Sequence, residues 1–131
     1  MPRQAGSCLS SQTLDIMATY VPFLSIEDED DLIVSFGLGA QAQTSLTLLR
    51  SPQLEFALHE EDRGVSVGGE SENVERELLK AIIWGRDTVE ILSTIRSYAL
   101  NVSAVDPIEI QEAKRVLRKM NFDNSFEVKD V

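Results

Sequence analysis

Short β-rich runs separated by turn residues constrain the fold of this chain more than any other feature. Residues 32–38 (LIVSFGL) and 44–50 (TSLTLLR) are rich in β-branched and large apolar residues, and Gly37 and Gly39 mark the end of the first run. This spacing predicts two antiparallel strands joined as a hairpin. Residues 18–24 (ATYVPFL) contain a proline and predict an edge or first strand before them.

The rest of the chain predicts two more hairpins. Residues 53–59 (QLEFALH) alternate between apolar and polar side chains after the break at Pro52, and residues 65–67 (VSV) are expected to pair back onto them. Residues 87–94 (DTVEILST) and 98–105 (YALNVSAV) predict the other hairpin. The alternation in 53–59 places its large apolar side chains on one face of the strand: Leu54, Phe56 and Leu58.

Two segments carry helical signals. At the C-terminal one, Asp106 is a good N-cap, Pro107 is tolerated at the first helical position, and Glu109 stands where a capping box would place it. An apolar stripe and basic last turns follow, and residues 126–128 alternate as a last strand. The other segment, residues 72–83, has apolar residues at helical spacing and predicts a helix, although it is also apolar enough to be a buried strand.

These elements predict an α+β fold: a single domain with a largely antiparallel sheet built of hairpins and one or two helices packed on one face. We expect residues 17–131 to form this domain and residues 1–16 to be a disordered N-terminal extension. Cys8 is the single cysteine, so it cannot form an intrachain disulfide. No stretch approaches the roughly 20 apolar residues of a membrane-spanning helix, and we expect a cytoplasmic protein.

Acidic residues dominate the charge, with 22 Asp and Glu against 12 Lys and Arg and a net charge of −10. The densest runs, residues 27–31 (EDEDD) and 59–62 (HEED), fall in predicted turns. Such a surface repels nucleic acid and anionic lipid and attracts basic proteins. The expected partner-binding residues are therefore four acids of the first run, three of the second and one aromatic residue at the start of a predicted strand: Glu27, Asp28, Asp30, Asp31, Glu60, Glu61, Asp62 and Tyr98.

Little in the sequence supports catalysis or cofactor binding. His59 is the one histidine and is followed directly by acids, but adjacent turn residues seldom converge on one metal ion. The run at 27–31 lacks the spaced ligands and central glycine of a calcium loop. No nucleophile elbow or dinucleotide fingerprint is present. We expect a protein with no catalytic residues, no metal and no cofactor.

The order of the predicted elements is similar to that of a family of bacterial immunity proteins. A strand ending in arginine (45–50, SLTLLR) leads to an acidic turn closed by glycine (60–64, EEDRG), and Gly68-Gly69 precedes a strand–turn–strand, a helix and a terminal strand. Over residues 18–130 this order resembles the immunity protein 10 family of polymorphic toxin systems. The resemblance implies a small cytoplasmic α+β protein that binds and neutralises one toxin domain without catalytic residues.

Two other classes of function stay open. A structural or adaptor subunit, such as an effector chaperone, could form a homodimer through exposed edge strands and the helix at 110–120. A small hydrolase could use carboxylates that no motif identifies. Salt dependence separates the first class from an acidic binding protein, because steered binding to a basic partner weakens at high salt and an apolar self-interface does not.

Overall fold

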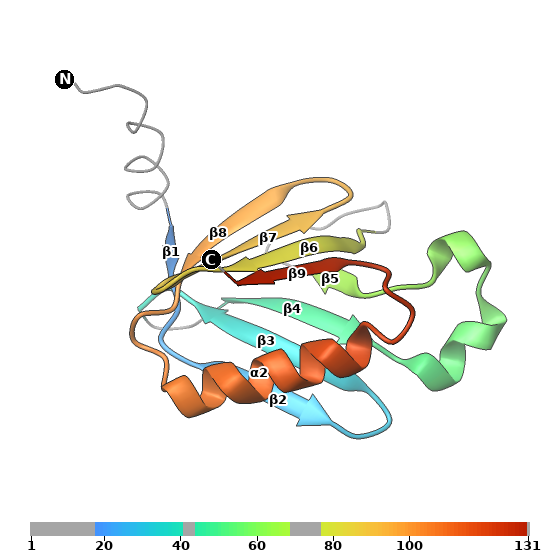
Figure 1. Ribbon diagram of the computed structural model, residues 1–131, viewed down its shortest axis with the longest axis horizontal. Helices are drawn as coiled ribbons and strands as arrows, with labels where there is room; N and C mark the ends of the chain where they lie inside the picture. The colour runs from blue at the N-terminus through green and yellow to red at the C-terminus, as the bar shows by residue number, and fades with distance from the viewer. Residues whose placement is uncertain (1–17, 41–43, 69–76, 131) are drawn as a thin grey trace.

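Two β-sheets and one long helix share a hydrophobic core in the computed structural model, which describes residues 18–40, 44–68 and 77–130 (Figure 1). The fold is α+β, a single domain with nine strands in the described residues, most of them antiparallel. The predicted fold class is confirmed. The prediction of one sheet is refined, since the strands divide between two.

The four-stranded sheet has the order β2-β3-β4-β5 and is antiparallel throughout. Its strands are β2 (Leu24–Asp28), β3 (Leu32–Leu38), β4 (Thr44–Arg50) and β5 (Ser66–Gly68). The predicted hairpin of β3 and β4 is confirmed, with Leu32 opposite Arg50 and Leu38 opposite Thr44. Side chains alternate between the two faces of a strand, and this alternation buries Val34 and Leu48 in the core.

The five-stranded sheet has the order β1-β8-β7-β6-β9. Its strands are β1 (Thr19–Tyr20), β6 (Leu79–Trp84), β7 (Thr88–Ser93), β8 (Ser97–Asn101) and β9 (Glu127–Asp130). The predicted hairpin is confirmed in β7 and β8, although β8 ends four residues before the predicted boundary. The edge strands β1 and β9 run parallel to their neighbours, so both ends of the described chain join this sheet.

Helix α2 (Pro107–Met120) packs beside β2 and β3 of the four-stranded sheet (Figure 1), and its basic side chains bind residues of both sheets. Lys114 binds Asp130 of β9, and Arg115 binds Asp28 of β2. Asp106 caps the helix by accepting a hydrogen bond of 2.8 Å from the backbone N–H of Ile108, as predicted. The capping-box role of Glu109 is wrong, because its Oε1 accepts from the backbone N–H of Leu24 instead. No helix among the described residues is long and apolar enough to cross a membrane.

The predicted strand at 53–59 is wrong. Residues Pro52–Ala57 form the 3₁₀ helix η1, and Glu60–Asp62 form a second one, η2. Pro52 presets a turn at the start of η1, and the backbone N–H of Leu54 closes it on Ser51. Without that strand, residues 65–67 cannot pair back onto it, and β5 pairs with β4.

Three further predictions of local structure need correction. Within 72–83, β6 is a strand because β7 and β9 pair with its two edges, and residues 69–76 lie outside the described part of the chain. The predicted strand at 18–24 divides into β1 and the start of β2, with Pro22 between them. The predicted turn at 27–31 is shorter, since Glu27 and Asp28 pair with β3. The predicted N-terminal extension, 1–16, lies outside the described residues.

Candidate functional site

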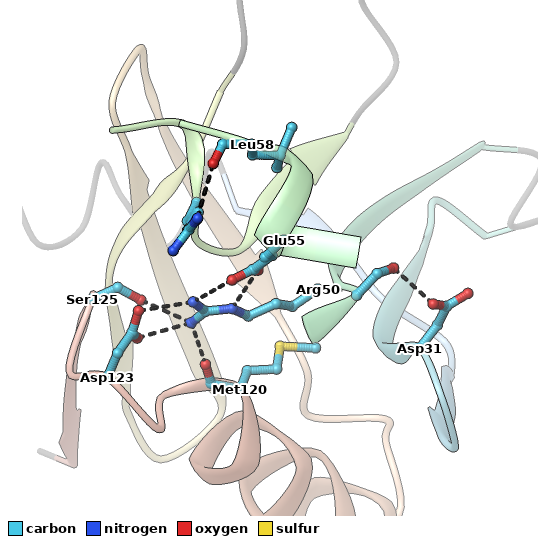
Figure 2. Close-up of polar contacts among 9 residues, drawn as sticks. Asp31, Arg50, Glu55, Leu58, Met120, Asp123 and Ser125 are labelled. Carbon is cyan, nitrogen blue, oxygen red and sulfur yellow. Dashed lines mark hydrogen bonds and ion pairs between the residues drawn. The ribbon is translucent and has the colours of Figure 1, made fainter. Parts of the chain in front are cut away.

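A buried arginine organises the end of the molecule where η1 meets the C-terminal end of α2. Inward positions alternate along β4, and Arg50 occupies the last of them, so its side chain is only 1% exposed. Its guanidinium donates to both carboxylate oxygens of Glu55, at 2.7 and 3.0 Å, and to both of Asp123, at 2.9 and 2.8 Å (Figure 2). It also donates to the backbone carbonyl of Met120 at 2.7 Å and to the hydroxyl of Ser125 at 3.2 Å.

These contacts compensate for the burial of the charge. Burial by itself would lower the pKa of Arg50, but the hydrogen bonds that it donates to Asp123 and Glu55, with their negative charges, outweigh burial and raise that pKa. The hydrogen bonds that Arg50 donates to Asp123 lower the pKa of Asp123 to about 2. The ring of Phe122 lies over the guanidinium, 4.1 Å from its central carbon to the ring centroid. Arg50 therefore holds β4, η1 and the segment after α2 in one arrangement.

The contact with Arg50 reverses which side chains of residues 53–59 we expected to be buried. Glu55 is buried because its carboxylate binds Arg50, while Leu54 and Phe56 on either side of it are 65% and 81% exposed. The sequence pattern had placed these two apolar residues together on one strand face with Leu58. Phe56 is the most exposed large apolar residue in the described part of the chain.

The two acidic runs flank this segment. In the first run, Asp31 accepts a hydrogen bond of 2.7 Å from the hydroxyl of Ser51, and Asp30 accepts one of 3.2 Å from the amide of Gln53. The second run forms η2 and follows η1 directly. We name this surface the loop face and define it by its apolar residues Leu54 and Phe56 and its acidic residues: Asp30, Asp31, Glu60, Glu61 and Asp62.

The remaining residues expected to bind a partner lie in other surroundings. Glu27 is exposed on β2. Asp28 is half-buried and accepts hydrogen bonds from Lys119 at 2.6 Å and Arg115 at 2.9 Å, which lower its pKa. Tyr98 lies on the five-stranded sheet and donates to Glu77 at 2.6 Å; burial and this contact raise its pKa to about 12. Asp28 and Tyr98 thus already make internal contacts.

The sequence analysis did not identify Leu54 and Phe56 as residues of the loop face. It also did not identify the buried pair that holds η1 in place, Arg50 and Glu55. A signal was available in Ser51-Pro52, because serine followed by proline is a common start of a helix. The pairing of Arg50 with Asp123 had no such signal, since 73 residues separate them in the chain.

The loop face thus combines two exposed apolar side chains on η1 with acidic residues on the segments next to it. Within the described ranges, no group of three or more His, Cys, Asp or Glu side chains is placed to hold a metal ion. Comparison with family models gives no match, and neither curated proteins nor solved structures match the chain. The resemblance to the immunity protein 10 family rests on the residues that suggested it and stays a prediction.

Proposed function

We propose that this protein is a non-catalytic, acidic protein-binding domain whose loop face binds a basic partner domain. One observation carries the proposal: Leu54 and Phe56 are held exposed on η1 between two acidic segments. In line with the family resemblance, we propose that the partner is a toxin domain and that the protein is a cytoplasmic bacterial immunity protein.

The two parts of the loop face would contribute differently to binding. Carboxylates such as Glu60 and Glu61 raise the association rate toward a basic surface and select against acidic ones. Leu54 and Phe56 would supply the desolvated centre that slows dissociation. The Arg50 network beneath them reduces the ordering cost of binding, because η1 is already tied to the core. Toxin domains that act on nucleic acid have basic clefts, which such a surface would occlude.

The test begins with the product of the reading frame next to this gene. Its effector domain is expressed with and without this protein, growth is scored, and the affinity of the purified pair is measured at low and high salt. The apolar centre is removed with Leu54→Ser/Phe56→Ser, and the charge with Glu60→Gln/Glu61→Gln. Ile108→Ser is the apolar control, since Ile108 is exposed at the start of α2, and Asp87→Asn/Glu127→Gln is the charge control.

We expect the intact protein and both controls to restore growth. The apolar variant should bind at least about tenfold more weakly, and the charge variant should lose most of its salt dependence. Restored growth that does not depend on Leu54 and Phe56 would contradict the loop face as the binding surface. If the effector does not bind and the protein instead self-associates equally at low and high salt, the adaptor class is favoured over the proposal.

A further inference from the structure

A pocket of about 270 Å³ lies at the N-terminal end of α2, at the opposite end of the helix from Met120, whose carbonyl binds Arg50. It is formed by the end of β6, the turn between β6 and β7, the loop after β8 and the first two turns of α2. Valine, proline and isoleucine side chains from that loop and from α2 line part of it: Val102, Val105, Pro107 and Ile110. The pocket is independent of the loop face.

Two cationic side chains line the same pocket, in a chain whose net charge is −10. Lys114 has its ammonium 5.2 Å from the centroid of the Trp84 ring and 2.8 Å from a carboxylate oxygen of the exposed Asp130. Arg86 is exposed, and its guanidinium has no hydrogen bond or ion pair with another residue in the described part of the chain. Asp87 adds one negative charge to the lining.

Trp84, which also lines the pocket, brings an unpaired donor to this region. The residue is 2% exposed, and its indole Nε1–H has no acceptor within the ranges 18–40, 44–68 and 77–130. A buried N–H without a partner costs roughly 1–3 kcal/mol, so most such groups are paired in folded proteins. An acceptor oxygen supplied by a bound molecule would remove this cost.

We propose that this pocket binds a small organic anion with an apolar body and one carboxylate. The apolar side chains would cover the body, while Arg86 and Lys114 would bind the carboxylate by charge-assisted hydrogen bonds. The volume is at the lower end for ligand pockets and suits a molecule smaller than a nucleotide. Asp87 disfavours a second negative charge, which selects a carboxylate over a phosphate dianion.

Trp84 is the single tryptophan of the chain, so its indole N–H gives one resolved peak in a ¹H–¹⁵N NMR spectrum. The experiment titrates the full chain with hexanoate, with hexylammonium and hexan-1-ol as matched cationic and neutral probes, and with inorganic phosphate. We expect hexanoate to shift the Trp84 peak saturably and to bind at least about tenfold more tightly than the other three.

Variants test the two cations. Arg86→Gln and Lys114→Gln should each weaken hexanoate binding about tenfold, whereas Arg118→Gln makes the same charge change on the exposed side of α2 and should leave it unchanged. Thermal unfolding confirms that each variant is folded. The proposal is overturned if saturating hexanoate leaves the Trp84 peak in place, if hexylammonium, hexan-1-ol or phosphate binds as tightly, or if Arg118→Gln weakens binding as much as the pocket variants.

Discussion

Arg50 and Glu77 are both charged and almost fully buried, at 1% and 3% exposure, yet their surroundings differ. Arg50 meets two carboxylates that come from segments far apart in the chain. Glu77 accepts hydrogen bonds from two hydroxyls of the β7–β8 hairpin, Ser93 at 2.5 Å and Tyr98 at 2.6 Å. Arg96 forms an ion pair with the same carboxylate at 3.9 Å.

The difference shows what each buried charge does for the fold. Burying a charge costs several kcal/mol, and this cost is offset only by good geometry around the whole group. Arg50 links β4, η1 and the end of α2, so the loop face depends on it. Within the described residues, the Glu77 carboxylate binds two side chains of the β7–β8 hairpin. The Arg50 network therefore couples stability to the proposed site, while the Glu77 network stabilises one sheet.

Replacing Arg50 should have the largest effect. Arg50→Ala leaves Glu55 buried without its cation. We therefore expect the free energy of unfolding, measured in urea, to fall by about 3–5 kcal/mol. Arg50→Met/Glu55→Met should recover part of this loss because no buried charge is left unpaired. Arg118→Ala, on the exposed side of α2, is the control and should cost less than about 0.5 kcal/mol. A loss at Arg50 as small as the control's would contradict the central role of this network.

Removing one hydroxyl from Glu77 should have a smaller effect. Tyr98→Phe deletes a hydrogen bond to a charged group, and we expect a loss of about 1.5–3 kcal/mol in the same urea experiment. Ser93→Ala deletes the other hydroxyl, and the double variant measures how strongly the two contacts depend on each other. If Tyr98→Phe cost more than Arg50→Ala, the comparison between the two networks would be reversed.

The two networks should fail at opposite ends of the pH scale. Arg50 lowers the pKa of Asp123 from 3.8 to about 2, so this stabilisation is complete above pH 3.8 and is lost as pH falls through 2. Burial and Glu77 raise the pKa of Tyr98 from 10.0 to about 12, so its contribution is complete below pH 10.0 and is lost as pH rises through 12. Urea midpoints measured against pH would show both losses.

Two variants test whether Asp123 and Tyr98 cause these losses of stability. Asp123→Asn should flatten the change between pH 3.8 and 2 and leave the alkaline change intact, whereas Tyr98→Phe should do the reverse. An acid loss that persists unchanged in Asp123→Asn would have to come from other carboxylates.

The surface cluster on α2 should have the smallest effect. Arg115 and Lys119 bind Asp28 with short contacts, but both cations are partly open to solvent and Asp28 is only half-buried. Exposed ion pairs contribute little because water and salt screen them. We expect Asp28→Asn to leave the thermal midpoint nearly unchanged, and any difference to disappear at high salt. A loss comparable to that of Tyr98→Phe would show that this contact holds α2 on β2.

Local signals predicted much of the fold. Alternation and glycines located the β3–β4 hairpin, and Asp106-Pro107 located the start of α2. Alternation was misleading for residues 53–59. It suggested a strand, but most of this segment belongs to the 3₁₀ helix η1, which Arg50 holds through Glu55. Helical spacing was misleading for β6, because the adjacent β7 and the distant β9 pair with its two edges.

The sequence by itself determined the α+β class, the main hairpins, the long helix and the excess of acid, since each depends on neighbouring residues or on composition. Only the tertiary structure decided that Glu55 is buried while Leu54 and Phe56 are exposed, and that Asp28 is bound by α2 while Asp30 and Asp31 flank η1. The physical reason is that a buried arginine needs carboxylates from distant segments, and these contacts orient the loop against its own pattern.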